Sequence, residues 1–454
     1  MIDVYTIKTA IRAVLPVIML TGYHRLLAAV ASWWYGNASR SMMVIGVTGT
    51  NGKSTTVSLI GQILMHSGYR IGWTSTATIR IGDTQWLNDT KMTMLGPFAL
   101  QRLLRRMKQA KCTVAIVEVS SEGLALFRHQ GIVFDTAVFT NLTPEHLERH
   151  GGMSNYIAAK RMLFETLAAR EPKTIQSVDV PTVIVSNADD DVGREFLRLP
   201  ANRWIGYSVV AGSDAGHAPV PVGVERLVGV IQQQRLEGTS ISVDGCPMTL
   251  ALPSVVNVYN AMAAIAATRS FNIPLATVAE ALSRAQGVPG RMEWIVEGQP
   301  FLAMVEYSPE PASLNALYQY VTRHHSGRII HVLGSAGGGR DKARRPIMGQ
   351  IAASNADIVI VTNEDPYDED PHSIIDQVAQ GARSAIATRM KQLETIVDRG
   401  QAITRAVALA APGDLLLLTG KACEQTICVA GGKKIPWDDR LQLREAIKQK
   451  YGNS

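Results

Sequence analysis

The eight residues at positions 47–54, Val-Thr-Gly-Thr-Asn-Gly-Lys-Ser, constrain the fold of this chain more than any other segment. They follow an apolar run at residues 42–45 and precede residues 55–65, where apolar side chains recur at helical spacing. Strand, glycine loop and helix in this order are typical of a phosphate-binding loop, in which backbone N–H groups and a lysine hold phosphates and a hydroxyl faces Mg²⁺. The sequence therefore predicts a nucleoside triphosphate site in an α/β fold.

The rest of the chain alternates short β-rich runs with helical stretches, as in doubly wound α/β domains with mostly parallel sheets. We expect central strands at residues 43–47, 114–119, 136–140 and 182–185, helices at 98–109, 155–169 and 258–269, and a small antiparallel excursion at 204–252. The turn-rich residues 287–290 predict a linker, followed by strands at 303–306, 328–333, 358–362 and 415–419. The predicted organisation is an apolar helical N-terminal segment at 1–41, a central P-loop domain at 42–287 and a C-terminal Rossmann-like α/β domain at 288–454.

Length and composition exclude several classes of protein. A chain of 454 residues exceeds one ordinary core, so two or three domains are expected. The net charge of +6 is modest, and no Lys/Arg run marks a nucleic-acid arm. The excess of basic residues therefore serves either the binding of anionic small molecules or solubility. The four cysteines form no CxxC pair, so we expect reduced thiols, a cytoplasmic protein and no structural zinc.

The first forty residues are unusually apolar. Arg12, Pro16, His24 and Arg25 interrupt them, so no run reaches the length of a membrane-spanning helix, and the pattern of a cleavable signal peptide is missing. Two interpretations stay open. The segment is either an apolar helical hairpin packed on the body, or a helix that binds a membrane surface or a partner, with Trp33 and Trp34 as anchors.

Two further residues are candidates for metal chemistry. Glu118 lies at the carboxyl end of an expected strand, where acids of parallel sheets usually face a ligand. His146 follows the next strand in Thr-Asn-Leu-Thr-Pro-Glu-His-Leu, residues 140–147, although a lone histidine is as often structural.

Several motifs in one order resemble the Mur ligase family, and most closely its UDP-N-acetylmuramoyl-tripeptide synthetase branch. They are T-G-T-N-G-K-S at 48–54, E-V-S-S-E-G at 118–123, T-N-L-T-P-E-H-L at 140–147, Y-x-x-x-K-x-x-L-F at 156–164, N-A-D-D at 187–190, G-R-M-E at 290–293 and the stretch at 339–346. Val47, where the general loop pattern has glycine, agrees with this family. The resemblance implies an ATP-dependent ligase that joins an amino acid to a carboxylate of a peptidoglycan precursor through an acyl phosphate.

The resemblance also implies roles for individual residues. Lys53, Glu118, His146 and Lys160 would be catalytic, and Ser54, Glu118, His146 and a carbamylated Lys160 would hold two Mg²⁺ ions. ATP would be bound by Gly49, Thr50, Asn51, Gly52, Lys53, Ser54, Thr55, Asn141, Asn257, Asn260, Glu306 and Arg291, the last of which would close over it from the second domain. The acceptor would contact Thr93, Ser120 and Arg128, and the incoming amino acid would contact Arg340, Glu364, Asp365 and Glu424.

Three departures from the family bear on the substrates. Glu306-Tyr307-Ser308-Pro309 replaces D-Y-A-H, which lengthens the acid and removes a histidine. Glu364-Asp365-Pro366-Tyr367 replaces the D-N-P-R of diaminopimelate-adding members, and tyrosine cannot grip a distal carboxylate as an arginine fork does. Diaminopimelate is therefore disfavoured, and the acids at 364, 365 and 368 either favour an ammonium side chain such as that of lysine or form a solvated acidic loop.

The third departure is that only about forty residues precede the loop, where the family normally has a uridine-nucleotide-binding domain. This suggests a muramyl-peptide-like acceptor that is lipid-linked or lacks a nucleotide, with residues 1–36 holding the enzyme at the inner face of the membrane. Alternatives are a related ligase acting on poly-glutamate, folate or a cyanophycin-like acceptor, a P-loop NTPase without ligase activity, and a catalytically inactive binding protein. The sequence leaves the oligomeric state open.

Overall fold

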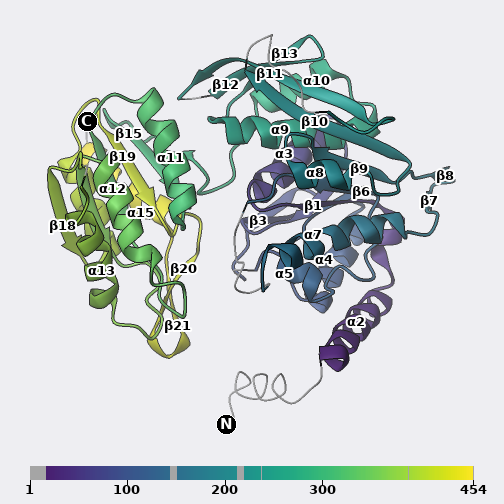
Figure 1. Ribbon diagram of the computed structural model, residues 1–454, viewed down its shortest axis with the longest axis horizontal. Coiled ribbons are helices and arrows are strands. Elements are labelled where there is room, and N and C mark those ends of the chain that lie inside the picture. The colour runs from purple at the N-terminus through teal and green to yellow at the C-terminus, as the bar shows by residue number, and fades with distance from the viewer. Residues whose placement is uncertain are drawn as a thin grey trace. The chain divides into compact units, whose positions relative to one another are not determined.

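The computed structural model describes residues 17–90, 92–143, 151–211, 219–236, 238–386 and 388–452 (Figure 1). It divides into two compact units, Met1–Gln286 and Gly287–Ser454, each of which is described here by itself. The division lies at the start of the stretch read as a linker. The N-terminal segment that we set apart at residues 1–41 belongs by its contacts to the first unit.

The first unit is built on one large sheet with the strand order β13-β12-β11-β10-β9-β6-β1-β5-β2-β3-β4. All neighbouring pairs from β11 to β2 are parallel, which confirms the expected α/β class. The strands are β1 (Met43–Thr48), β2 (Ile71–Thr74), β3 (Thr78–Ile81), β4 (Thr84–Leu87), β5 (Val114–Glu118), β6 (Thr136–Phe139), β9 (Val183–Asn187), β10 (Arg203–Ala211), β11 (Glu225–Arg235), β12 (Gly238–Val243) and β13 (Cys246–Leu250), with a separate small hairpin of β7 (Thr174–Ile175) and β8 (Val178–Asp179).

Helices cover both faces of this sheet, so its central strands are buried on both sides. Ile45 and Val47 of β1 point into one core, and Val44 points into the other, as the two-residue period of a strand requires. The first core contains α3 (Lys53–His66), α9 (Val255–Thr268) and α10 (Leu275–Ser283), and the second contains α4 (Pro97–Gln109), α5 (Ser121–Ala125), α7 (Met153–Ala168) and α8 (Asp191–Phe196).

The segment expected as an antiparallel excursion is only partly antiparallel. β10 pairs in parallel with both β9 and β11, and the antiparallel pairs begin with β11–β12 and continue with β12–β13. Short alternating Val/Gly bursts do not reveal strand direction, because direction depends on the connections between strands. The strands β10 to β13 therefore extend the central sheet and do not form a separate sheet.

In the part of the chain that the structure describes, two elements precede β1, namely α2 (Val17–Trp34) and the short η1 (Ala38–Ser41). A buried lysine fastens η1 to the sheet: Lys173 Nζ donates to Ser39 O (2.8 Å) and Met42 O (2.7 Å) and pairs with Asp135 at 2.6 Å. Of the predicted hairpin, the first part lies outside the described residues. No helix in the described part of the chain is long and apolar enough to cross a bilayer.

The second unit has a six-stranded sheet with the order β14-β15-β19-β16-β17-β18, parallel except for β14. Its strands are β14 (Glu293–Trp294), β15 (Leu302–Glu306), β16 (Ile329–Leu333), β17 (Ile358–Thr362), β18 (Gln392–Ile396) and β19 (Leu415–Thr419), beside a hairpin of β20 (Thr426–Val429) and β21 (Lys433–Pro436). Its helices are α11 (Pro311–His324), α12 (Arg344–Asn355), α13 (Pro371–Arg383), α14 (Arg399–Leu409) and α15 (Asp439–Tyr451). The four strands expected in this unit are all present.

Candidate active site

The predicted phosphate loop connects β1 to α3 and depends on two glycines. Gly49 and Gly52 have φ of 151° and 81°, a region that side chains with a Cβ rarely adopt. A Cβ on Gly49 would lie 1.9 Å from Thr140 Oγ1, and one on Gly52 would lie 2.0 Å from Asn260 Oδ1. Both glycines are therefore required by conformation and by space, and α3 begins at the next residue with its N-terminal amides toward the loop.

Residues after β6 brace the loop. Asn141 accepts at its backbone oxygen from Thr50 N (2.8 Å) and at Oδ1 from Asn51 N (2.9 Å), and its Nδ2 donates to Asn51 O (3.1 Å). Thr140 Oγ1 donates to the same Asn51 oxygen at 2.7 Å. The structure thus places Asn141 at the loop, where the sequence predicted it. Asn141 also fixes the conformation of the loop backbone through these hydrogen bonds.

Two lysine ammonium groups converge on carbonyl oxygens of this loop. Lys53 Nζ donates to Thr50 O at 2.7 Å, and Lys160 Nζ donates to Gly49 O at 2.6 Å. Lys160 is 1% exposed and lies 4.4 Å above the ring of Tyr156, whose hydroxyl is 3.0 Å from Thr50 Oγ1. A buried amine beside a glycine loop favours either an anionic ligand or chemical conversion of the amine.

Glu118 forms the centre of a chain of oxygen atoms next to the loop. Its Oε2 accepts from Ser54 Oγ (2.8 Å) and Thr76 N (2.7 Å), and its Oε1 accepts from Thr76 Oγ1 (2.9 Å). Thr76 Oγ1 also contacts Thr93 Oγ1 at 3.0 Å, so the predicted metal and acceptor residues are joined. Sequence reasoning missed Thr76; its position just after β2, which pairs with β5, was the available signal.

The donor set fits Mg²⁺. Ser54 and Glu118 supply hydroxyl and carboxylate oxygens, which Mg²⁺ prefers, and this ion commonly keeps water and phosphate oxygens as its other ligands. Among the residues that the structure describes, no three His, Cys, Asp or Glu side chains are grouped to hold a metal. His146 lies outside the described residues.

Of the remaining predicted residues of the first unit, Asn260 touches the loop, and Ser120 and Arg128 have partners outside it. Asn260 of α9 abuts Gly52 and donates to Asn257 Oδ1 at 3.1 Å. Ser120 Oγ caps α5 by accepting from Gly123 N at 3.1 Å, and Arg128 Nη1 donates to the backbone oxygen of Met94, the neighbour of Thr93, at 2.6 Å. Arg128 and the Thr93 segment, distant in sequence, are therefore adjacent.

In the second unit, the predicted residues lie in loops that follow the carboxyl ends of parallel strands. Glu306 ends β15, and its carboxylate accepts from Met292 N (2.6 Å) and Ser308 N (3.1 Å). The guanidinium of Arg291 lies 4.5 Å above the ring of Tyr307. Glu306 thus orients the segment that carries Arg291.

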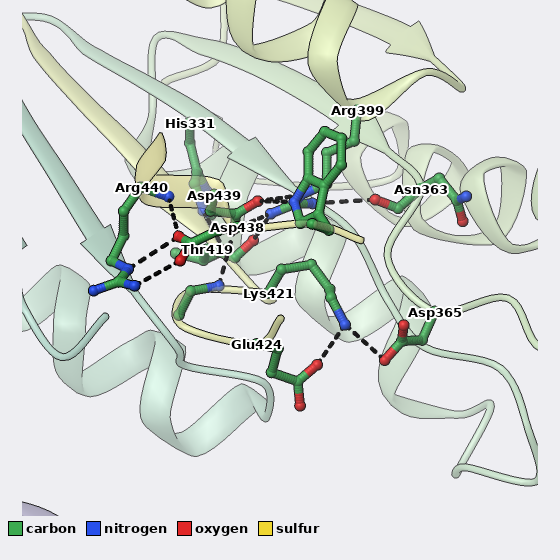
Figure 2. Close-up of polar contacts among 12 residues, drawn as sticks. His331, Asn363, Asp365, Arg399, Thr419, Lys421, Glu424, Asp438, Asp439 and Arg440 are labelled. Carbon is green, nitrogen blue, oxygen red and sulfur yellow. Dashed lines mark hydrogen bonds and ion pairs between the residues drawn. The ribbon is translucent and has the colours of Figure 1, made fainter. Parts of the chain in front are cut away.

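A buried lysine joins two of the predicted amino-acid residues (Figure 2). Lys421 has no exposed surface, and its Nζ donates to Asp365 Oδ2 at 2.9 Å and pairs with Glu424. The other Asp365 oxygen accepts from Cys428 N at 2.6 Å. Sequence reasoning left Lys421 out of the site, although the motif at 420–424 contains it; the structure places it between two residues that were included.

Arg399 is buried, and its side chain connects the two loops that carry these residues (Figure 2). Its Nε and Nη2 donate to the carboxylate of Asp439, each at 2.7 Å, and it also donates to Asn363 O (3.1 Å) and Thr419 O (2.7 Å). Asp439 Oδ2 accepts from Ala422 N at 2.9 Å. One guanidinium therefore fixes the starts of the 363–370 and 420–424 loops.

The acidic loop after β17 is only partly directed at a ligand. Asp365 and Asp368 hold the backbone amides of Cys428 and Gly431. Glu364 is buried beside Gly420, and burial raises its carboxyl pKa against the lowering effect of Arg399 and Lys421. Desolvation lowers the pKa of the Arg340 guanidinium, but the coulombic effects of Tyr307, Tyr367, Glu364 and Glu424 together raise it above its ordinary value.

Tyr367 is the residue that the sequence resemblance matches with the arginine of diaminopimelate-adding members. It has φ of 53°, and its ring lies so close to Gly338 that a Cβ there would be 2.5 Å from it. Tyr367 N donates to Cys428 O at 3.0 Å. The phenol ring of Tyr367, which packs against Gly338, thus lies at the end of this loop.

Comparison with known proteins agrees with this geometry. Residues 47–268 match the family model of the Mur ligase middle domain, and residues 290–422 match that of the Mur ligase, glutamate ligase domain. The chain is 36% identical over 443 residues to a UDP-N-acetylmuramyl-tripeptide synthetase of Roseiflexus sp. (strain RS-1), covering 96% of this chain and 85% of that protein. It is 37% identical over 450 residues to a UDP-N-acetylmuramoyl-L-alanyl-D-glutamate–2,6-diaminopimelate ligase of Chlorobium phaeobacteroides, covering 96% and 82%.

Solved structures show the same architecture. A UDP-N-acetylmuramoyl-L-alanyl-D-glutamate–2,6-diaminopimelate ligase superposes with a TM-score of 0.61 at 28% identity, covering 90% of this chain and 79% of that one. A pseudomurein peptide ligase type C from Methanothermus fervidus gives 0.59 at 19% identity, covering 90% and 79%, which supports the fold alone.

The first prediction concerns Thr76. Thr76→Val keeps the shape but removes the hydroxyl that orients Glu118, and loss of such an outer hydrogen bond to a metal ligand typically weakens metal affinity or activity by about 10- to 100-fold. A Mg²⁺ titration of ATP-dependent phosphate release should shift to higher Mg²⁺ by about that factor. Thr84→Val, at an exposed strand position, is the matched control. Identical titrations for the two variants would contradict the role of Thr76.

The second prediction concerns Arg399. Arg399→Met leaves the Asp439 carboxylate buried without its cation, which should lower the free energy of unfolding by about 3–5 kcal/mol. Arg405→Met, on the same helix, removes only a part-exposed pair with Glu394 and should cost less than about 1 kcal/mol. Calorimetric melting of both variants tests this, and equal losses would show that Arg399 does not tie the loops.

Proposed function

Because this chain belongs to the Mur ligase family, we propose that it uses ATP to join an amino acid to a carboxylate of a muramyl-peptide-like acceptor in peptidoglycan precursor synthesis. The observation that carries the proposal is the convergence of Lys53, Lys160 and the Ser54–Glu118 pair on one glycine loop. A loop of this kind binds phosphates, and the adjacent oxygen donors suit the metal that accompanies them.

The first half-reaction is phosphoryl transfer to the acceptor carboxylate, which gives an acyl phosphate and ADP. We assign the phosphates to the loop amides, Lys53 and Asn141, because these groups line the N-terminal end of α3. Mg²⁺, held by Ser54 and Glu118, would neutralise charge on the phosphates. Thr93, Ser120 and Arg128 are the proposed acceptor contacts, and the hydrogen bond between Thr76 and Thr93 supports placing the acceptor next to Glu118.

The second half-reaction is attack of the amino acid's amine on the acyl phosphate, which forms the amide and releases phosphate. We assign the amino acid's carboxylate to Arg340 and its ammonium to Glu424 and Glu364, because these residues lie in the loops that follow the neighbouring parallel strands β16, β19 and β17. Asp365 acts through Lys421, because both its oxygens are already bonded within the loop. With Tyr367 where an arginine fork would be needed, the proposed amino acid is lysine or another residue without a distal carboxylate.

We further propose that Lys160 is carbamylated and that its carbamate binds a second Mg²⁺. The ammonium first loses one proton to give the neutral amine, and addition of CO₂ with loss of a second proton then gives the carbamate, so that a cation becomes an anion. Burial supports this, because Lys160 is 1% exposed, a charged amine loses its hydration when it is buried, and the neutral amine is the form that reacts with CO₂. We propose that the protein acts in the cytoplasm and contacts the inner face of the membrane peripherally through residues 1–36.

The function is tested by amino-acid-dependent phosphate release. The full chain is incubated with ATP, Mg²⁺, UDP-N-acetylmuramoyl-L-alanyl-D-glutamate or its nucleotide-free analogue, and a panel of amino acids, with products identified by mass spectrometry. We expect release to rise at least about tenfold with lysine and an adduct to form, and diaminopimelate to be a poorer substrate. ATP hydrolysis that no amino acid or acceptor changes, with no adduct, would identify an NTPase; an adduct formed only with poly-glutamate or folate would move the acceptor to another class.

The carbamate is tested by chemical rescue. Lys160→Ala should lower ligation by at least about 100-fold, because a metal ligand is lost, and short-chain carboxylic acids should restore part of it. Lys173→Ala, another buried lysine that pairs with Asp135 away from the loop, is the control that carboxylic acids should not rescue. Wild-type activity in Lys160→Ala, without any effect of added acids, would refute the carbamate.

A further inference from the structure

The helix α2 buries small side chains and exposes large apolar ones, which is the reverse of the pattern of an ordinary surface helix. Among its described side chains, at residues 21–34, the buried ones are the small residues Ala28, Ala31 and Ser32, and Ser32 Oγ donates to Gly131 O at 2.8 Å. There is no room for anything larger, because a Cβ on Gly131 would be 2.5 Å from Ser32 Cβ. A surface helix normally buries its large apolar residues and exposes small and polar ones.

Five large apolar or aromatic side chains in the described part of α2 face outward. Leu26 is 65% exposed, Trp33 72% and Trp34 64%, and Tyr23 and Val30 are exposed with them. Residues 23, 26, 30 and 33 are spaced as i, i+3, i+7 and i+10, so they form one stripe along the helix. A continuous exposed stripe of this kind marks an interaction surface, whereas single exposed apolar residues do not.

The stripe continues onto α4, which is basic. The ring of Tyr35, directly after α2, meets the part-exposed ring of Phe98 edge to face at 6.4 Å. From Phe98 the same face of α4 leads to Arg102 and Arg105 at i+4 and i+7, and both are exposed. Arg106 and Lys108 add further positive charge to this helix.

Acidic residues are scarce around this surface. The sequence contains no Asp or Glu between Val4 and Gly82, or between Pro97 and Lys111. Glu171, which reaches Arg40 beside α2, is neutralised by that contact at 3.2 Å. An apolar aromatic stripe next to an acid-free basic helix matches a bilayer surface with anionic headgroups, where Trp and Tyr rings lie at headgroup level and arginines bind phosphate.

We propose that α2 and α4 together form a membrane-binding surface that prefers anionic phospholipids. The stripe at Tyr23, Leu26, Val30 and Trp33 enters the headgroup region, and Arg102 and Arg105 of α4 supply the lipid selectivity. This adds α4 and a lipid class to the membrane contact of residues 1–36, and it is independent of the ligase reaction, so that either can fail alone.

The experiment is vesicle co-sedimentation of the full chain. Vesicles of phosphatidylcholine alone are compared with vesicles in which about one third of the lipid is phosphatidylglycerol, and we expect binding to the anionic vesicles to be at least about tenfold stronger and to weaken with salt. Arg102→Gln/Arg105→Gln should reduce that binding by roughly tenfold or more, since each cation near an anionic surface contributes about a fivefold factor. Trp33→Ser/Trp34→Ser should weaken binding to both kinds of vesicle.

The matched control is Arg284→Gln/Arg383→Gln, which removes the exposed arginine directly after α10 and the one that ends α13, and should leave lipid binding unchanged. Circular dichroism and melting temperature establish that every variant folds. Binding of neither vesicle by the wild type would overturn the proposal, as would equal losses in the control. A wild-type dimer that Trp33→Ser/Trp34→Ser converts to monomer, without lipid binding, would assign the stripe to a second copy of the chain instead.

Discussion

The parallel pairing of β1 with β5 and β6 is the constraint on which the candidate site of the first unit depends. Parallel strands end at the same edge of a sheet, so Thr48, Glu118 and Phe139 come to one edge although they are far apart in sequence. The phosphate loop, the carboxylate and the bracing segment at 140–143 follow directly from these three strand ends. The surrounding contacts, from the two glycines to the buried lysine, refine an arrangement that strand direction has already decided.

The second unit applies the same constraint to a different chemistry. Its strands β15, β19, β16 and β17 are parallel neighbours, and their following loops carry all the residues that we assign to the amino acid. Loops alone would not hold such a site rigidly. Arg399 provides rigidity because its planar fork bonds two carbonyl oxygens and both carboxylate oxygens of Asp439 at once.

The two ends of the first unit's sheet differ in character. At the carboxyl end, the polar groups of Lys53, Lys160 and Ser54 are bonded to the glycine loop and to Glu118. At the amino end, Lys173 and Asp135 neutralise each other and fasten the entering chain. The helix α2 comes before this ion pair in the fold and packs through small residues, which leaves large apolar side chains exposed. The same unit thus separates a polar catalytic edge from an apolar, basic surface.

The sequence by itself determined the α/β class, the strands around the phosphate loop and most of the residues gathered there, because glycine, lysine and hydroxyl at fixed spacing admit few structures. It could not supply Thr76, Lys421 or Arg399, since each acts on residues dozens of positions away and resembles an ordinary polar side chain in sequence. Nor could it give the direction of β10, which depends on strand connections. Only the tertiary structure decided that Asp365 holds a lysine and that the aromatic side of α2 faces outward, because partners and burial are properties of packing, which a linear pattern does not encode.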